Sequence, residues 1–408
     1  MKARPDLLHA DSPPGLEVFQ LTHEERVPGS HIYMEAQIFT PDSHRLVLHR
    51  SAHPHGSDPQ DPEHSYLVCD LASGELTPVT EELGATAPSV TPDGQTLYYF
   101  VNQTVLGGGS LTLKKVGLDG AGRETVMVVD GPLPDSGFRV SRPYPLSTIS
   151  ADGNRLALSC FLGDGHSPAA PWGLLVFDLQ APSVALVVHG PSWCNMHPQY
   201  CRATGAEAMR DILIQENHGN ECRPDGTCIR LTGGHGADIH VIRDDGSAMR
   251  VMPWGRDGNE FCQGHQCWIG RTVRAITSTG TREPPSARLI AGRPVSHAGH
   301  LGLETPGGWR NDLTRELPAP DFYHFATDIE GRWLITDSGP REQGGGVWLA
   351  ELPAEAEAPL RNMTFLLNPR SSWDKGAHIH PFLAPDGRTG FFNSDESGIL
   401  QAYMVRGW

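Results

Sequence analysis

A short pattern of two apolar runs separated by a polar turn recurs along the chain and strongly limits the folds it can adopt. The clearest copies are IFTPDSHRLVLHR (38–50), SVTPDGQTLYYFV (89–101) and TISADGNRLALSC (148–160). Each copy places apolar residues on both sides of a D-x-G-like turn, which predicts a β-hairpin. Further copies follow at intervals of about 50 to 70 residues, at 198–215, 266–279, 325–338 and 381–395.

Most copies are followed by a second pair of predicted strands. These pairs lie at 65–80, 110–129, 172–188, 238–253 and 346–366. Four short strands per unit, repeated seven times with almost no helical periodicity, are typical of a seven-bladed β-propeller. The last unit has only a third strand, at 400–406, so we expect the segment 15–22 to add the fourth strand and close the ring.

The repeat also decides the domain organisation that we expect. A length of 408 residues alone suggests two or three domains. Seven units in one ring instead make residues 1–408 a single all-β domain. A two-domain β-sandwich is the alternative fold.

Charge and terminal sequence narrow the classes of partner. A formal net charge of -16 argues against general nucleic-acid binding, which needs a basic face. The N-terminus has no apolar stretch typical of a secretory signal, and no window is apolar enough for a membrane span. We therefore expect a cytoplasmic protein with no membrane partner, and the oligomeric state stays open. Walker loops, dinucleotide fingerprints, G-x-S-x-G elbows and H-E-x-x-H motifs do not occur in the sequence.

Six of the eight cysteines lie between Cys194 and Cys267. None forms the C-x2-C pair that zinc sites favour. Cys222 and Cys228 could close a loop disulfide, which a cytoplasm would keep reduced. We interpret the cysteines as small buried apolar side chains, and their oxidation state stays open.

Histidine is unusually frequent, with 20 copies, and five of them share one position in the repeat. They stand shortly before the hairpin turn, at the start of the strand that should be innermost, and they are His197, His265, His324, His378 and His380. Because they come from four consecutive units, we expect them to meet at one mouth of the central channel. The H-x-H pair at 378–380 would point both side chains to one face of a strand, with His324 as a third ligand. Three imidazoles suit several transition metals.

Other residues are candidate contacts for an anionic substrate. Arg202 and Lys375 could offset the acidic character of the chain, and His218 ends a strand that we expect near the same mouth. Trp268 could stack on a sugar face or pack between blades. A second H-x-H pair, at 53–55, and His235 and His240 are weaker candidates.

The histidines and their flanking segments resemble those of the oligogalacturonate lyases, a family of seven-bladed propeller polysaccharide lyases. The resemblance covers most of the chain and is strongest in WCNMHPQY, GHQCWIG, FYHFATDIEG and AHIHPFLAPDGRTGFFNSD. It implies that His324, His378 and His380 hold a divalent ion, with manganese first and zinc, iron, nickel or calcium as alternatives. It also implies that His265 is the general base. We expect the remaining histidine, His197, to contact the substrate.

The resemblance further implies β-elimination of short acidic pectin fragments in the cytoplasm, which is a carbon–oxygen lyase reaction. Lys375 stands where the family has a Gln, and Asp238 or His240 where it has an Arg, so a related uronide such as a glucuronide fits as well. The chemistry needs a cation to stabilise the charge that develops on a carboxylate, and a neutral base such as histidine to remove the α proton. The alternatives are a non-catalytic sugar- or protein-binding propeller and a glycoside hydrolase, which would need two carboxylates at the site.

Overall fold

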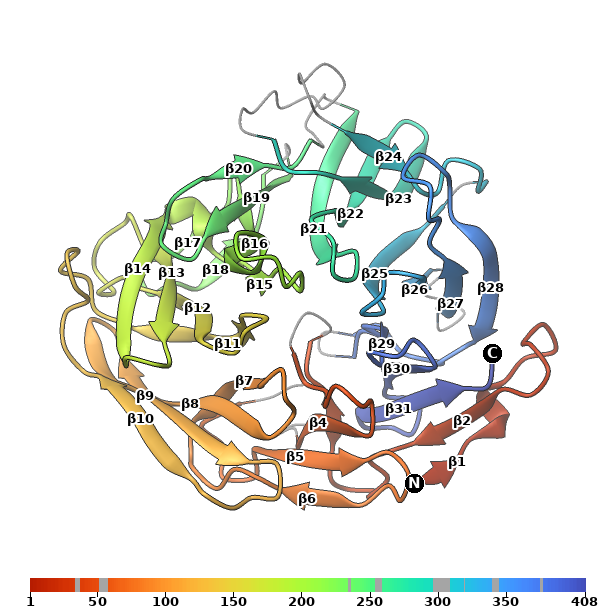
Figure 1. Cartoon of the computed structure of the whole chain (residues 1–408), viewed down its shortest axis with the longest axis horizontal. Coiled ribbons are helices and arrows are strands. Elements are labelled where there is room, and N and C mark those ends of the chain that lie inside the picture. Colours follow the sequence, from red (N-terminus) through yellow and green to blue (C-terminus); the bar gives the residue numbers. More distant parts are fainter. Residues whose placement is uncertain are drawn as a thin grey trace.

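The computed structural model describes residues 1–33, 37–50, 58–233, 236–253, 259–295, 309–318, 320–339, 345–374 and 377–408. Seven antiparallel sheets stand around a central channel, so the predicted seven-bladed β-propeller is confirmed (Figure 1). The described residues contain three short 3-10 turns and no α-helix; the turns are η1 (Pro5–Leu7), η2 (Pro191–Trp193) and η3 (Ala208–Arg210). No helix in these ranges has the length and apolar character needed to cross a membrane.

The strands of each blade follow one another from the channel outward. Blade 1 consists of β3 (Gly29–His31), β4 (Arg45–Arg50), β5 (Ser65–Asp70) and β6 (Leu76–Pro78). Blade 2 consists of β7 (Ala85–Val90), β8 (Thr96–Val105), β9 (Gly108–Gly117) and β10 (Glu124–Val129). Blade 3 consists of β11 (Arg142–Ile149), β12 (Arg155–Phe161), β13 (Trp172–Asp178) and β14 (Ser183–Gly190). Blade 4 consists of β15 (Gln199–Tyr200), β16 (Asp211–Asn217), β19 (Ala237–Arg243) and β20 (Arg250–Val251).

The second half of the ring continues the same order. Blade 5 consists of β21 (Glu260–Trp268), β22 (Ala275–Arg282), β23 (Pro285–Gly292) and β24 (Arg310–Asp312). Blade 6 consists of β25 (Phe322–Thr327), β26 (Trp333–Ser338), β27 (Gly346–Glu351) and β28 (Arg361–Leu367). Blade 7 consists of β29 (Phe382–Leu383), β30 (Thr389–Ser394), β31 (Gln401–Arg406), β2 (Glu17–Gln20) and β1 (Lys2–Ala3).

Side-chain hydrogen bonds stabilise the repeated turn. In the second copy the Thr91 hydroxyl donates to the Asp93 carboxylate over 2.6 Å, and the same carboxylate accepts from the Gln95 backbone over 3.0 Å. Asp152 binds Ser150 and the Asn154 backbone in the same way. An aspartate that closes its own turn fixes the hairpin locally, which explains why the pattern was visible in sequence.

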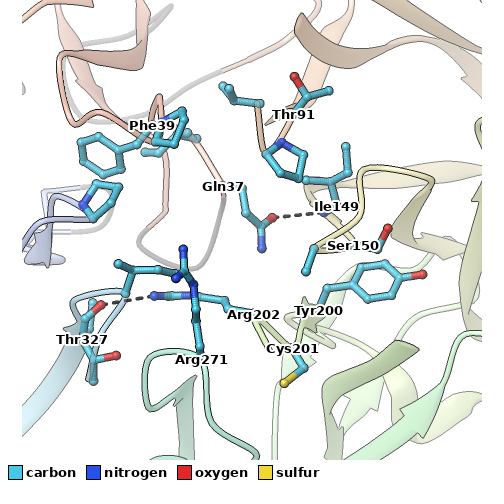
Figure 2. A pocket seen from close by; sticks show the side chains of 18 of the residues that line it. Gln37, Phe39, Thr91, Ile149, Ser150, Tyr200, Cys201, Arg202, Arg271 and Thr327 are labelled. Carbon is cyan, nitrogen blue, oxygen red and sulfur yellow. Dashed lines mark hydrogen bonds between the residues drawn. The ribbon is translucent and has the colours of Figure 1, made fainter. Parts of the chain in front are cut away.

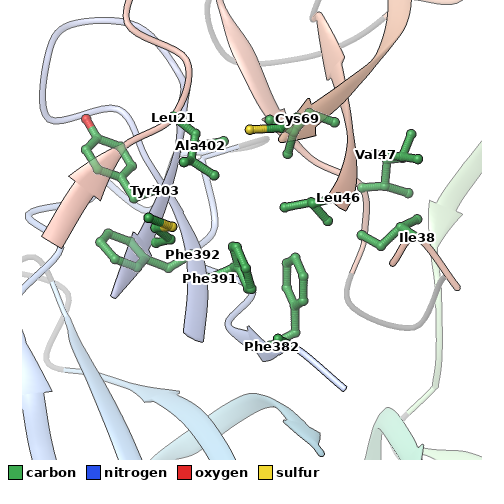
Figure 3. Packing of buried hydrophobic residues seen from close by; sticks show 14 of the residues in the cluster. Leu21, Ile38, Leu46, Val47, Cys69, Phe382, Phe391, Phe392, Ala402 and Tyr403 are labelled. Atoms are coloured by element: carbon green, nitrogen blue, oxygen red, sulfur yellow. The ribbon is translucent and has the colours of Figure 1, made fainter. Parts of the chain in front are cut away.

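The ring closes through the N-terminal strand, as predicted. Strand β2 pairs antiparallel with β31, with Val18 opposite Val405. The blade 7 aromatic side chains then pack toward blade 1 (Figure 3). Phe382 and Phe391 stack with ring centroids 5.3 Å apart within this cluster, which buries the seam between the last and first blades.

Four features were not predicted. Strand β1 adds a fifth strand to blade 7, and the inner strand of blade 1 is β3, whereas the start of the 38–50 copy contributes only an isolated bridge at Phe39. The outer strands β23 and β24 of blade 5 carry no clear turn pattern in sequence. A two-stranded hairpin, β17 (Glu221–Cys222) and β18 (Cys228–Arg230), is inserted in blade 4 between β16 and β19.

Candidate functional site

A cavity of about 310 Å³ opens at the mouth of the channel where the inner strands of blades 4 to 7 begin. All five histidines of the shared repeat position line it. Its described lining consists of Tyr33, Tyr144, Asn195, His197, His265, Tyr323, His324, Trp373, His378 and His380. The propeller therefore gathers side chains that are more than 180 positions apart in sequence around one space.

Strained backbone aims several of these side chains. Twelve described non-glycine residues have a left-handed φ, and five of them line the cavity: Asn195, His197, His265, Trp373 and His380. Such conformations cost about 1–3 kcal/mol each and persist where the surrounding structure enforces them, often at functional sites. The strain thus marks this cavity independently of its histidine content.

Three of the imidazoles form a candidate metal centre. One ligand atom each of His324, His378 and His380 lies within 4.8 Å of the others. Asp337, which is buried on β26, accepts from His324 Nδ1 over 2.7 Å and from the His324 backbone N–H over 2.9 Å. A carboxylate on one ring nitrogen fixes the orientation and tautomer of the imidazole and leaves the Nε2 atom to face the other two histidines.

His265 lies beside this group without belonging to it. Its ring centroid is 4.5 Å from that of His324, and its buried Nδ1 has no hydrogen-bond partner. Irregular register on both sides of Gly264 bulges β21 at this point and turns His265 inward. Burial, together with the neighbouring His324, His197 and His378, lowers the pKa of His265 well below its usual value.

A second set of contacts holds His197 at the edge of the cavity. The Tyr144 hydroxyl donates to Asn195 Oδ1 over 2.7 Å and is 3.1 Å from His197 Nε2. Tyr33 packs against both His197 and His380, with centroid distances of 5.0 and 4.7 Å. Tyr33 thus links the start of blade 1 to blades 4 and 7, and Tyr144 links blade 3 to blade 4.

The lining is electrostatically unusual for so acidic a chain. The formal net charge is -16, yet none of the ten described lining residues has a carboxylate side chain. The wall is aromatic and imidazole, with one amide. An anionic group would meet no repulsive carboxylate among these ten residues, and a pair of acids for glycoside hydrolysis is missing from this described lining.

The structure does not bring every predicted residue to this cavity. His218 Nε2 is 2.8 Å from buried Asp238, and His240 Nε2 is 3.0 Å from Glu216, so both histidines are held by hydrogen bonds to carboxylates within blade 4. Trp268 is fully buried, and its indole N–H donates to the Gln199 carbonyl over 3.0 Å, so it packs between blades instead of facing a sugar.

Arg202 lies at the opposite mouth of the channel. Its guanidinium donates to the Thr327 carbonyl over 3.3 Å inside a second cavity of about 240 Å³ (Figure 2). This second cavity is lined by residues at the far ends of the inner strands, such as Val90 and Ile149, where Gln37 accepts from the Ile149 N–H. Arg202, predicted to contact a substrate at the histidines, thus lines this second cavity and not the described part of the histidine cavity. The chemical type of a residue did not reveal which end of its strand it occupies.

Some predictions fall outside the described residues, and other site residues were not predicted. The predicted residues outside the described ranges are Lys375, His53, His55 and His235. The site residues that were not predicted are Tyr33, Tyr144, Asn195, Tyr323, Trp373 and Asp337. Asp337 lies in the second strand of the blade 6 hairpin, nearly opposite His324 in the first strand. Aligning the two strands across the repeat turn and looking for an acid opposite His324 could have predicted it.

Solved structures with this fold include oligogalacturonate lyases. An oligogalacturonate lyase in complex with manganese superposes with a TM-score of 0.71 at 17% identity, covering 100% of this chain and 97% of that one. An oligogalacturonate lyase from Vibrio parahaemolyticus gives a TM-score of 0.69 at 16% identity, covering 98% and 96%. The β-propeller domain of the Trilobed protease from Pyrococcus furiosus gives 0.53 at 9% identity, covering 93% and 95%.

These similarities establish a shared fold over the whole chain. No protein-family model matches the sequence, and a comparison with curated proteins found no match. The two lyases are more similar to this chain in fold than the protease propeller is, as their TM-scores show. The histidine cavity is thus built on a propeller fold that two solved oligogalacturonate lyases share.

Proposed function

We propose that this protein is a metal-dependent lyase that cleaves short acidic oligosaccharides by β-elimination. The observation that carries the proposal is the grouping of three converging imidazoles with a fourth, that of His265, which lines the same cavity. The first three are suited to hold an ion, and the fourth to accept a proton. The fold neighbours include an oligogalacturonate lyase with manganese, which supports the same assignment.

The donor set fits a divalent transition metal such as manganese. His324, His378 and His380 present three nitrogen ligands within reach of one ion, and Asp337 orients the first of them. Burial lowers the pKa of His380 well below its usual value, so its ring stays neutral and able to ligate at neutral pH. When bound, the ion supplies Lewis-acid stabilisation of the negative charge that develops on a substrate carboxylate.

His265 has the properties of a general base. Its lowered pKa keeps the ring unprotonated across the neutral range, and the ring lines the cavity directly beside His324. Removal of the proton α to the uronate carboxylate then allows the bond between the β carbon and the glycosidic oxygen to break. The products are an unsaturated uronate and a shortened sugar chain.

The remaining lining would bind and orient an acidic sugar. Tyr33, Tyr323 and Trp373 offer aromatic surface, and His197 offers a ring nitrogen held by Tyr144. The absence of carboxylates from the described lining favours elimination over hydrolysis, because a glycoside hydrolase needs two acids beside the scissile bond. Oligogalacturonides and oligoglucuronides are the first substrates to test.

His265→Ala tests the assignment. We expect kcat to fall by about 10²–10⁴, the usual contribution of a general base, while metal content stays unchanged. Turnover is measured by the ultraviolet absorbance of the unsaturated product in the presence of Mn²⁺, on a panel of oligouronides, and metal content by elemental analysis. The exposed His166, replaced by Ala, is the matched control.

Two results would contradict the proposal. Metal-loaded protein that is inactive on every uronide in the panel would exclude the lyase. Loss of metal from the His265→Ala variant would make His265 a ligand and leave the base unassigned.

A further inference from the structure

We propose a second metal site, for a thiophilic ion of the zinc class, formed by Cys194, Cys222 and Cys228. One sulfur atom of each lies within 4.8 Å of the other two. The site is separate from the histidine cavity and does not depend on the lyase assignment. Sequence spacing did not reveal it, because the three thiols come from two segments that only the fold brings together.

The geometry comes from the hairpin inserted in blade 4. Cys222 and Cys228 stand opposite each other across β17 and β18, with sulfur atoms 2.7 Å apart. Cys194 follows the 3-10 turn η2 and is fully buried beneath them. A tetrahedral ion with metal–sulfur bonds of about 2.3 Å holds its sulfur ligands about 3.8 Å apart, so small shifts of the exposed hairpin would complete the site.

The surroundings suit a thiolate cluster. The contacts of the Cys194 thiol with the Leu231 carbonyl and of the Cys228 thiol with the Gly226 carbonyl are both 4.0 Å long, so neither thiol has a close oxygen acceptor. The Asn220 amide donates to Cys222 Sγ over 3.4 Å.

A cation stands at the turn of the hairpin. The Arg142 guanidinium donates to the Gly226 carbonyl over 2.7 Å and would offset the net negative charge of an ion with three thiolates. The cation therefore stands close to the hairpin that carries Cys222 and Cys228.

The position of the cluster gives the ion a structural consequence. Asn195, which follows Cys194 directly, lines the histidine cavity, and the Asn217 amide holds the Cys194 carbonyl. An ion on the three sulfurs would tie the inserted hairpin to the segment that carries Asn195 and His197. Zinc would need a fourth ligand, for which water or the Asn220 side chain is available.

Cobalt substitution tests the site directly. Full-length protein is kept reduced with a phosphine, stripped of metal and titrated with Co²⁺, which gives thiolate-to-cobalt charge-transfer absorption only where sulfur binds the ion. We expect one equivalent with this absorption in the unsubstituted protein and in His380→Ala. We expect its loss in Cys228→Ser, which alters a half-buried hairpin residue, and in Cys222→Ser. Cys69→Ala, which alters a buried cysteine in blade 1, is the matched control.

The outcomes separate this site from the first one. The second site is supported if the thiolate–cobalt absorption is lost in Cys228→Ser and Cys222→Ser but kept in His380→Ala and Cys69→Ala. Zinc content, measured by elemental analysis, is a further check. Reduced protein that shows no thiolate–cobalt absorption would overturn it. An intact mass showing a Cys222–Cys228 disulfide that the phosphine does not reduce would also overturn it.

Discussion

At the scale of single residues, Asp337 decides what His324 can do. A histidine can ligate a metal through either ring nitrogen, and the carboxylate on Nδ1 selects the other one. Asp337 is fully buried, and its two oxygens meet the His324 ring and backbone, so the side chain is held as well as oriented. This contact makes a histidine of the repeat pattern into a preorganised ligand.

Replacing Asp337 with Asn should therefore weaken metal binding without removing any ligand. We expect Mn²⁺ affinity to fall by about 10–100-fold, as is typical when the carboxylate partner of a ligating histidine is lost. Isothermal titration with Mn²⁺ measures it, and Asp11→Asn, at an exposed position, serves as the control. Unchanged affinity would show that Asp337 acts only in folding.

At the scale of secondary-structure elements, the bulge in β21 aims the base. Gly264 has a φ of +87°, and a Cβ there would come within 2.6 Å of Gln215 Oε1. Gln215 in turn donates to Asn217, which holds the backbone of Cys194. One glycine thus lets β16 and β21 approach closely enough for His265 to face the metal ligands.

Gly264→Ala should misplace His265 by pushing β21 away from Gln215. We expect kcat to fall tenfold or more, since a displacement of about 1 Å at a reacting group is enough for such losses. Gly122→Ala is a matched control, because Gly122 also has a left-handed φ but has open space around it. Equal effects of the two substitutions on kcat would contradict the role of the close approach.

The two ends of the inner strands serve different cavities, and Arg202 tests this division. It lies at the end of the channel remote from the histidines. Arg202→Ala should leave kcat/KM within about twofold of its original value. A large rise in KM would show that the substrate passes through the channel to both mouths.

At the scale of the whole molecule, histidines of blade 1 that lie outside the site couple stability to pH. Burial lowers the pKa of His31 to about 4 and that of His49 to about 3. Both histidines belong to blade 1, and the His31 ring packs against Phe382 of blade 7. The ring seam therefore contains groups that resist protonation while the protein is folded.

We expect the free energy of unfolding to decrease as the pH falls below about 6.5. Below this pH the histidines bind protons in the unfolded chain but stay unprotonated in the folded protein. The free energy of unfolding therefore decreases by up to about 1.4 kcal/mol per pH unit for each histidine, until the pH reaches the pKa of that histidine in the folded protein. Urea unfolding between pH 7 and pH 5 measures the slope. His31→Gln should reduce it, whereas replacing the exposed His44 should not. An identical slope in the His31 variant would contradict this coupling.

The hairpins could be predicted most clearly where the turn is fixed locally, by an aspartate such as Asp93 or Asp152 bound to its own turn. The shared position of the histidines in the repeat was visible for the same reason. The inserted hairpin and the outer strands of blade 5 carry weaker local signals. Their positions depend on packing against neighbouring blades, which no single segment encodes.

The sequence alone determined the ring, its closure and the set of histidines at the starts of inner strands, because period-two patterning and turn chemistry act over a few residues. Only the tertiary structure decided which groups meet across blades. It placed Asp337 on His324, sent Arg202 to the other mouth, buried Trp268, and joined Cys194 to Cys222 and Cys228. These contacts depend on how each strand twists and bulges as it packs, so the spacing of residues along the chain does not fix them.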